Sequence, residues 1–353
     1  MRQVSVDTLI VGQGLAGSAL AWHLAAAGQQ VEVIDDGLKT SSSKVAAGLV
    51  NPLAGMRFNR RPEVHGWLSY AEDWYEEIGK RFDQQFYYPV PMLRLFRSNE
   101  QRRFHDRALS DPNNATLLDD RPITGDDFAG LQAQFGGFFQ RRTGYLDIPG
   151  LLDTMRTWLE SRSRFRRGDS PAAALEVHDD RVVLDSISAR QVVFCDGARL
   201  RENPWFPELP MCPEKGEILD LQIPGVDHHR IVNGKHWLVP RPGGGFRFGA
   251  THEHRQIDLQ PTQTGRDALT KGMQEMLTRT TDVRIVDHLA GIRPATSDRY
   301  PLIGRHARHP GIMVFNGFGA RGALSIPWYA KQMTAHLLDG IALPTEANIA
   351  RFR

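Results

Sequence analysis

The feature that most constrains this chain is a glycine-rich turn between a strand and a helix near the N-terminus. Residues 4–11 (VSVDTLIV) form a β-rich run, and the sequence GQGLAG follows at once at residues 12–17. Residues 18–27 then have helical spacing, and residues 30–34 (QVEVI) predict a second strand. This order predicts a βαβ unit with the GxGxxG spacing of a dinucleotide-binding fold.

Each glycine of this turn has a physical task. Gly12 permits the tight turn, Gly14 lets the backbone approach a pyrophosphate, and Gly17 lets the helix pack on the strand, while free N–H groups at the helix N-terminus face the phosphates. Asp35 follows Gly12 by 23 residues and ends the second strand, where a carboxylate can accept hydrogen bonds from both hydroxyls of an adenosine ribose. The cofactor residues predicted here are Gly12, Gly14, Leu15, Ala16, Gly17 and Asp35.

The motif alone fits both FAD and NAD(P), but its position at residue 12 favours FAD. Residues 41–52 (SSSKVAAGLVNP) form a small-residue stretch that lets the backbone approach a flat ring closely. No second GxGxxG occurs in the sequence, so a separate NAD(P)H domain is not expected and the substrate itself should be the reductant. The candidates from this stretch are Ser42, Ala47, Gly48 and Leu49.

A second strand–glycine–helix sequence lies in the C-terminal third. Residues 312–315 predict a strand, residues 316–322 (NGFGARG) a glycine-rich turn, and residues 323–338 a helix. The helix N-terminus would face negative charge, which in a flavoenzyme is the N1–C2=O edge of the reduced ring. The alternative is a plain strand-to-helix connection. The candidate residues are Gly317, Phe318, Gly319, Ala320, Arg321 and Gly322.

The middle of the chain predicts the remaining architecture. A strand over 191–195 ends in Asp196-Gly197, which is typical of a returning parallel strand, and both residues are candidates for binding the cofactor. PGGG at 242–245 predicts a hairpin. We therefore expect an α/β fold, α+β overall, in which a Rossmann-like FAD-binding domain carries a discontinuous, mainly antiparallel β substrate domain. The expected boundaries are 1–80, 140–205 and 290–353 for the FAD-binding domain, and 81–139 and 206–289 for the substrate domain.

Composition excludes several other classes of protein. The chain has 353 residues and a formal net charge of +2, which is not the charge of a dedicated nucleic-acid binder. Cys195 and Cys212 are the only cysteines and form no CxxC pair, so we expect a reducing, cytoplasmic setting without a disulfide framework. No apolar run reaches the ~18 residues that would span a bilayer. His228-His229 and His252-x-His254 have no third ligand in register, so no metal is expected.

Together, these landmarks resemble the D-amino-acid oxidase superfamily, and within it glycine oxidase, sarcosine oxidase and the oxidase half of the tRNA wobble-uridine modification enzyme. They are the N-terminal motif with Asp35, the AAGL stretch, the GAT strand end at 249–251, GIRPATSDRYPLIG at 291–304 and NGFGARG. The resemblance implies FAD, and hydride transfer to flavin N5 from a C–H next to an amine nitrogen, giving an imine that hydrolyses. The implied substrate is a small amine or amino acid.

The resemblance also implies roles for particular residues. Arg293 occupies the place of an arginine that grips the substrate carboxylate, a task that suits its planar, permanently charged fork. The alternative for Arg293 is a structural ion pair with Asp298 or another acid. Arg321 matches a second arginine that steadies flavin or substrate. Trp237 and His252 match positions in the wall on the substrate side of the site. The competing interpretation for His252 is a hydrogen-bonded wall residue without a chemical role.

Two departures from the family bear on the cofactor. Val45 stands where some members have a flavin-linking histidine, and Pro294 and Ala295 stand where sarcosine oxidases have a flavin-linking cysteine. None of these side chains can form such a bond, so FAD should be non-covalent. The strand around Trp237 also lacks the tyrosine of many amino-acid-specific members, which weakens the case for one particular substrate.

Two other functions stay open. One is oxidation of the carboxymethylaminomethyl group of a tRNA wobble uridine, using arginine clusters at 57–61 and 162–167; the other is a flavin subunit that passes electrons to a partner. Only seven of the 43 basic residues are lysine, so clustered arginine is also expected by abundance alone. The electron acceptor, which is oxygen, a quinone or a protein, and the oligomeric state are not determined by the sequence.

Overall fold

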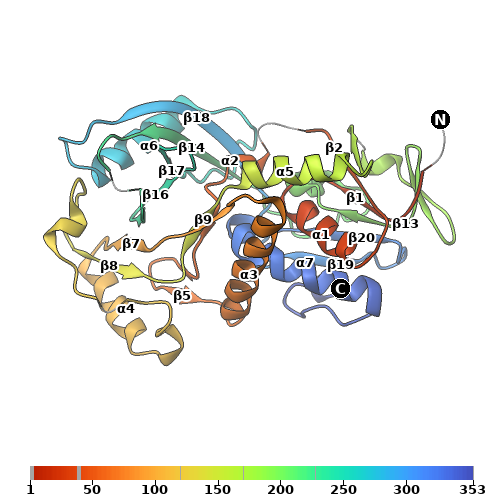
Figure 1. The fold of residues 1–353 in the computed structure, drawn as a ribbon, viewed down its shortest axis with the longest axis horizontal. Coiled ribbons are helices and arrows are strands. Elements are labelled where there is room, and N and C mark those ends of the chain that lie inside the picture. The colour runs from red at the N-terminus through yellow and green to blue at the C-terminus, as the bar shows by residue number, and fades with distance from the viewer. Residues whose placement is uncertain (1–3, 38–40, 120, 170, 227, 353) are drawn as a thin grey trace. The chain divides into compact units, whose positions relative to one another are not determined.

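The computed structural model describes residues 4–37, 41–119, 121–169, 171–226 and 228–352, and the chain divides into two compact units (Figure 1). Unit 1 comprises residues 1–44, 148–214 and 292–353; unit 2 comprises 45–147 and 215–291. Both units are therefore discontinuous in sequence. The first crossing falls at residue 44 rather than near 80, because residues 45–80 pair and pack with unit 2 elements.

Unit 1 contains the predicted βαβ unit inside a larger sheet. Its strands run in the order β10-β2-β1-β13, and β2, β1 and β13 are parallel to one another. The first half of β13 pairs with β12, and its second half pairs in parallel with β20. The elements are β1 Val4–Val11, α1 Leu15–Ala26, β2 Val31–Asp35, α2 Ser42–Val45, α5 Ile148–Glu160, β10 Phe165–Arg167, β11 Glu176–Val177, β12 Val182–Leu184, β13 Ile187–Phe194, β19 Leu302–Arg305, β20 Ile312–Asn316 and α7 Gly322–Asp339.

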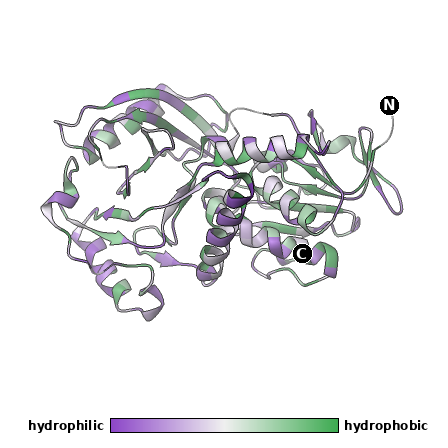
Figure 2. Ribbon diagram, viewed as in Figure 1, coloured by the Kyte–Doolittle hydropathy of each residue, from purple (hydrophilic) through white to green (hydrophobic). Residues whose placement is uncertain are grey.

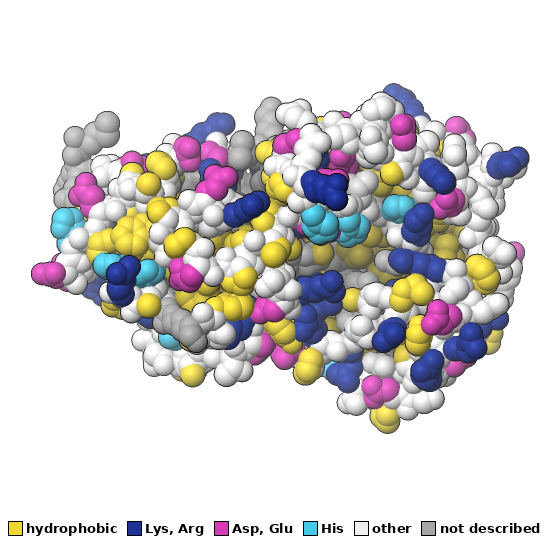
Figure 3. Space-filling model, turned by 180° about the vertical axis from the view of Figure 1, so that it is seen from behind, with side chains coloured by type: hydrophobic (Ala, Val, Ile, Leu, Met, Phe, Trp, Pro, Cys, Tyr) yellow, Lys and Arg dark blue, Asp and Glu magenta, His cyan; other side chains and the backbone are white. Residues whose placement is uncertain are grey.

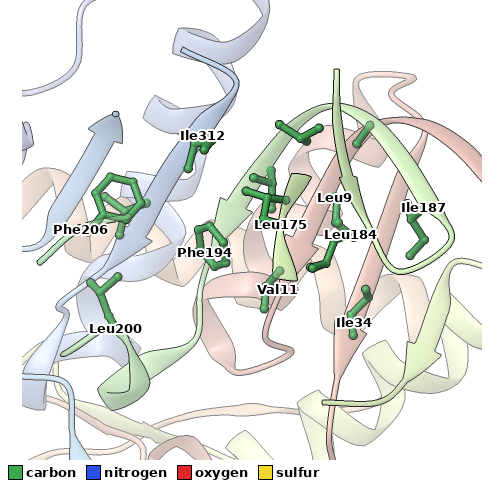
Figure 4. Packing of buried hydrophobic residues seen from close by; sticks show 14 of the residues in the cluster. Leu9, Val11, Ile34, Leu175, Leu184, Ile187, Phe194, Leu200, Phe206 and Ile312 are labelled. Atoms are coloured by element: carbon green, nitrogen blue, oxygen red, sulfur yellow. The ribbon is translucent and has the colours of Figure 1, made fainter. Parts of the chain in front are cut away.

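One face of this sheet carries a continuous hydrophobic core. The same face of the sheet carries Leu9 and Val11 of β1, Phe194 of β13 and Ile312 of β20 (Figure 4). Phe206, from the connection between β13 and β14, packs in the same cluster. Alternate residues of a strand face the same side of the sheet, which is why Leu9 and Val11 lie together. The other face of β1 is covered by α1, which packs on α7.

Unit 2 is built on a mainly antiparallel sheet with the order β18-β14-β17-β16-β15-β7-β8, in which only the pairing of β15 with β7 is parallel among the registers described. Hydrophilic and hydrophobic residues mix along β18 and α3 (Figure 2), as expected where one side of an element is buried. The elements are β3 Leu49–Val50, β4 Leu53–Ala54, β5 Asn59–Arg60, α3 Val64–Phe82, β6 Tyr87–Pro89, β7 Met92–Leu95, α4 Asn99–Leu109, β8 Gly137–Gln140, β9 Gly144–Leu146, β14 Glu214–Gln222, β15 Ile231–Asn233, β16 Trp237–Pro240, β17 Phe246–Gly249, α6 Gln263–Met276 and β18 Arg284–Arg293.

The predicted hairpin of β16 and β17 is confirmed, with Trp237 opposite Gly249. Helix α6 begins at Gln263, where the Thr262 side chain caps it by accepting a hydrogen bond from Gly265 N. The nearby strands β6 and β7 belong to different sheets. Among the residues described, no helix has both the length and the apolar character needed to cross a membrane.

Candidate active site

Three neighbouring strand ends of unit 1 bring the predicted cofactor residues together. Strands β1, β13 and β20 are adjacent and parallel, so their carboxyl ends lie at one edge of the sheet. The Gly12 turn follows β1, Asp196 follows β13, and the Gly317 turn follows β20. Ligands of open parallel sheets bind outside this edge.

The first turn has no room for side chains at two of its glycines. Gly12 has a φ of +103°, and a Cβ there would lie 2.5 Å from Cys195 O. A Cβ on Gly17 would overlap Gly12 O, so α1 can approach the turn only without a side chain. At Gly14 a Cβ would lie 3.2 Å from Ser43 Oγ. The turn is therefore a tight backbone cradle at the N-terminus of α1, as the sequence predicts.

Asp35 belongs to a polar network that the motif does not reveal. Gln13 N donates to Asp35 Oδ2 at 2.8 Å, and Gly37 N donates to Oδ1 at 2.7 Å. Arg156 of α5 pairs with Asp35 Oδ1 at 3.4 Å and donates to Gln13 Oε1 through Nε at 2.9 Å. These contacts fix the carboxylate at the end of β2, and no sequence signal points to Arg156, which lies 121 residues beyond Asp35.

A serine of α2 contacts the first turn of α1. Leu15 N donates to Ser43 Oγ at 3.2 Å, which partners one N–H of the helix N-terminus. The sequence predicts the adjacent Ser42, which lies in the same short helix. Sequence reasoning cannot separate the two, because a four-residue helix gives no periodicity from which to orient them.

Asp196 is half-buried at the end of β13. Asn316 Nδ2, at the end of β20, donates to Asp196 Oδ1 at 2.9 Å and to Gly197 O at 3.1 Å. Burial raises the pKa of Asp196 to about 6, against the opposing effects of Asn203, Arg199 and the Asn316 bond. This pair joins the ends of two adjacent strands beside the Gly12 turn.

The C-terminal glycine turn is held by residues next to Arg293. Gly317 has a φ of +77° and Gly319 a φ of +53°, and Gly319 N donates to Pro294 O at 3.1 Å. A Cβ on Gly317 would lie 2.8 Å from Thr296 Cγ2. Phe318 is buried, whereas Arg321 is half-buried at the start of α7. The turn is thus tied to the Arg293-Pro294 segment.

Arg293 forms an ion pair with an acid that no sequence pattern indicates. Its Nη1 lies 3.1 Å from Glu214 Oε2, and both side chains are largely buried. Asp298, the acid considered from the sequence, instead pairs with Arg351 at 2.8 Å. Glu214 therefore orients the Arg293 guanidinium.

Unit 2 holds the stretch that contains Ala47, Gly48 and Leu49. Arg247 of β17 donates to Val45 O at 3.1 Å and also to Ala46 O, and it pairs with Asp220 at 3.2 Å. Gly48, with a φ of +67°, accepts a hydrogen bond from Leu146 N, and a Cβ there would overlap Leu146 O. Leu49 pairs with Tyr145 across β3 and β9.

Aromatic side chains gather around this stretch. Trp237 packs in one cluster with Ala47, Leu49 and Tyr145, and a Cβ on the facing Gly249 would lie 3.0 Å from the Trp237 ring. Tyr88 stacks on Tyr145 with centroids 4.9 Å apart, and burial raises the pKa of Tyr145 to about 12, so its phenol stays protonated. The cluster lies within unit 2.

His252 is placed differently from Trp237. It is exposed beyond the end of β17 and is not a member of that aromatic cluster. The two tyrosines of the cluster come from β6 and β9 rather than from the strand that carries Trp237. Sequence reasoning did not identify them, because their pairing depends on strands 57 residues apart in the chain.

Within the described residues, charged side chains do not form a metal centre. No group of three or more His, Cys, Asp or Glu in the described part of the chain is arranged to hold a metal ion. Lys and Arg side chains are scattered over the face shown in Figure 3, with acidic side chains between them. The histidine-rich stretches singled out by the sequence are not joined by any third ligand among these residues.

The residues of unit 1 fit a dinucleotide. The Gly12 turn is a cradle that a Cβ would fill, the α1 N-terminus faces it, and a second glycine turn stands at the same sheet edge. FAD has a diphosphate for the first turn and a ring system whose reduced form carries negative charge, which suits a second helix N-terminus.

Comparison with known proteins identifies the class. Residues 7–336 match the family described as FAD dependent oxidoreductase, so the chain belongs to that family, and the predicted resemblance is confirmed. It is 26% identical to the glycine oxidase of Pseudomonas aeruginosa over 362 residues, covering 96% of each chain. It is also 25% identical to the tRNA 5-methylaminomethyl-2-thiouridine biosynthesis bifunctional protein of Marinobacter nauticus, covering 92% of this chain and 54% of that protein.

Solved structures show the same fold. The iminodiacetate oxidase of Chelativorans superposes with a TM-score of 0.83 at 22% identity, and covers 98% of both chains. The glycine oxidase of Geobacillus kaustophilus gives a TM-score of 0.81 at 20% identity, and covers 99% of this chain and 98% of its own. The predicted fold class, an α/β FAD domain with an antiparallel substrate domain, is therefore confirmed.

Proposed function

We propose that this protein oxidises the C–N bond of a small amine or amino acid that carries a carboxylate, with Arg293 as the carboxylate-binding residue. The observation that carries the proposal is the bond from Gly319 N to Pro294 O. This bond connects the Arg293-Pro294 segment to the glycine turn that would hold the flavin. The same local structure would therefore position both the carboxylate-binding arginine and the cofactor.

Arg293 has the chemistry for this role. Glu214 holds one side of its fork at 3.1 Å and so limits the rotamers of a long side chain before substrate arrives. A substrate carboxylate would accept hydrogen bonds from other N–H groups of the same guanidinium. We also propose Trp237, which the family resemblance assigns to the substrate-side wall, as an apolar contact for the substrate.

The residues that would hold FAD are those of the two glycine turns, with Asp35 for the ribose and the Ala47–Leu49 stretch for the ring. FAD, when bound, supplies the acceptor for the hydride, with its two electrons, that is removed from the substrate carbon. Val45, Pro294 and Ala295 offer no nucleophile for a covalent link, so we propose non-covalent binding. Substrate positioning by the chain then matters most for the rate.

The test compares Arg293→Lys and Arg293→Ala with wild type in anaerobic flavin reduction by stopped flow. Amine substrates with and without a carboxylate are compared. Loss of a desolvated charge partner costs about 2–5 kcal/mol, so we expect affinity for the carboxylate substrate to fall roughly 30- to 4000-fold, with FAD content unchanged. Lys should not restore binding, because it lacks the bidentate fork.

Arg351→Lys is the matched control, because Arg351 is also a largely buried arginine of unit 1 paired with an acid. It should leave substrate affinity unchanged. Equal losses for substrates with and without a carboxylate, or loss of FAD from the Arg293 variants, would show that Arg293 is a structural residue.

A second candidate function rests on the similarity to the Marinobacter nauticus bifunctional protein, whose name specifies tRNA modification. In that case Arg293 would hold the carboxylate of a carboxymethylaminomethyl group on a nucleoside. The discriminating measurement is flavin reduction by tRNA that carries this group, compared with glycine and iminodiacetate. Reduction by the free amino acids alone would exclude the tRNA function.

A further inference from the structure

Unit 2 contains a basic pocket that belongs to neither the glycine turns nor the aromatic cluster. It has a volume of about 570 Å³ and lies between the β4–β5 hairpin and the C-terminal part of α4. This volume falls within the roughly 300–1,000 Å³ range of small-ligand sites. The lining residues used below are Arg57, Arg60, Phe104, Arg107, Asp111 and Asn114.

The charge of the pocket suits a phosphate monoester. Arg57, Arg60 and Arg107 contribute three positive charges, and Asp111 contributes the single carboxylate of the lining. Hydrogen bonds from Asn113 lower the pKa of Asp111, so its carboxylate is ionised at neutral pH. The balance of +2 matches the charge of about −1.5 to −2 on a phosphate monoester.

Phe104 positions two of these arginines. The Arg57 guanidinium lies over the Phe104 ring at 5.5 Å from its centroid, and that of Arg107 lies at 4.9 Å. Both arginines are exposed residues, yet the shared ring keeps their charged groups together in the pocket lining. The sequence places Arg57 and Arg107 fifty residues apart, so only the fold reveals the pair.

Two buried polar atoms of the lining have no hydrogen-bond partner among the described residues. Asn114 is 5% exposed; its Nδ2 donates to Ala108 O, but its Oδ1 accepts no hydrogen bond from any described residue. Arg60 Nε is likewise buried without an acceptor in the described chain, and Arg60 Nη2 lies 3.8 Å from Asp111 Oδ2. A buried acceptor and a buried donor left open in this way are costly unless a ligand satisfies them.

The hairpin side of the pocket is fixed by a buried arginine. Arg94 of β7, which is 5% exposed, donates to Leu53 O at 2.8 Å and to Gly55 O at 3.4 Å, and its guanidinium lies 4.8 Å from the Phe58 ring centroid. The hairpin that carries Arg57 and Arg60 is therefore preorganised, which reduces the entropy that a ligand must overcome.

From this geometry we propose that the pocket is a nucleotide-binding site, in which Arg57, Arg60 and Arg107 bind the 5′-phosphate and a sugar or base donor satisfies Asn114 Oδ1. Inorganic phosphate alone would fill only a small part of the pocket. It would contact the arginines but would leave Asn114 Oδ1 without a hydrogen-bond donor. The nucleotide can be free or part of a single-stranded RNA, because the two present the same phosphate, hydroxyl and amino groups.

The test uses FAD-loaded protein, so that the dinucleotide site is filled, and measures UMP binding by isothermal titration calorimetry. Arg57→Gln and Arg107→Gln should each weaken UMP binding about tenfold or more, since each removes a charge-assisted contact. Arg103→Gln is the matched control: Arg103 is exposed on the same helix α4 but is not part of the pocket lining, so affinity should change less than about twofold. Thermal melts confirm that each variant is folded.

Further titrations separate the sources of the nucleotide. Uridine should bind at least about tenfold more weakly than UMP, and inorganic phosphate should also bind more weakly. A short oligouridylate that binds more tightly than UMP, with affinity that falls with salt and with Arg57→Gln, would identify RNA as the source; equal affinity would identify the free nucleotide. Absence of UMP and oligouridylate binding, equal losses in Arg103→Gln, or phosphate binding as tight as UMP would overturn the proposal.

Discussion

At the scale of single residues, Gly12 combines a left-handed backbone with close contact. Its φ is +103°, and a Cβ would lie 2.5 Å from Cys195 O. We expect Gly12→Ala to lower stability by about 1–3 kcal/mol and to reduce bound FAD severely, because the turn must shift. The measurement is flavin absorbance per protein, with urea unfolding of the apoprotein.

Gly28→Ala is the control for strain without a clash. Gly28 has a φ of +82°, but a Cβ there meets nothing within 4 Å. The Gly28→Ala variant should lose some stability but bind as much FAD as the wild type. If both variants lost FAD equally, the steric clash at Gly12 would not be the cause of the reduced FAD binding.

Asp196 gives a prediction about pH. Its pKa is about 6 in the folded state and lies near 3.9 in the unfolded chain, so between these values the folded state binds more protons. Stability should therefore be highest below about pH 4 for this group and fall as pH rises to about 6, by roughly 2–3 kcal/mol in all. Well above pH 6, this contribution of Asp196 to the free energy of unfolding no longer changes with pH.

Asp196→Asn removes this titration and can still accept the bond from Asn316. Its stability relative to wild type should rise as pH increases from about 4 to about 7, measured by urea unfolding of the apoprotein at several pH values. A constant difference between the two proteins across that range would mean that Asp196 does not titrate there.

At the scale of elements, Arg247 links β17 to the segment Val45-Ala46, at the end of α2 and just after it. It donates to two carbonyl groups of that segment and pairs with Asp220, and burial lowers its pKa. Arg247→Met should lower stability by about 2–4 kcal/mol, because it frees two carbonyl groups and unbalances a buried acid. It should also make the chain near Ala46 more sensitive to proteolysis and reduce FAD content.

Arg241→Met separates the two roles of Arg247. Arg241 pairs with the same Asp220 at 2.5 Å but is more exposed, and no bond from it to the Ala46 segment is described. It should cost less than about 1 kcal/mol and leave FAD content near that of wild type. Comparable FAD loss in both variants would assign the effect to Asp220 rather than to the segment.

At the scale of the whole molecule, the chain passes between its two units at residues 44, 147, 214 and 291. FAD in this proposal binds the folded chain and not the unfolded one, so FAD binding should stabilise the folded state. Free FAD at about 100 times its Kd should add about 3 kcal/mol to the free energy of unfolding. In thermal melts of the apoprotein, the transition temperature should rise with increasing FAD, and Gly12→Ala should remove the rise. A transition temperature that does not change with FAD would contradict this prediction.

The sequence by itself determined the βαβ unit, the glycine turns, the hairpin and the family. These features depend on neighbours in the chain: hydrophobic period, turn residues and fixed spacing act over fewer than about 25 residues. The positions of Gly12, Asp35 and Gly317 at strand ends therefore follow from local spacing alone.

Only the tertiary structure decided the partners of these residues. Arg156 with Asp35, Glu214 with Arg293, Asn316 with Asp196, and Tyr88 with Tyr145 all join segments more than fifty residues apart. The boundary between the two units at residue 44 was also decided by the tertiary structure, because it depends on which sheet the following strands join. Such contacts are set by sheet order and by helix packing over long separations, and local patterns carry no record of them.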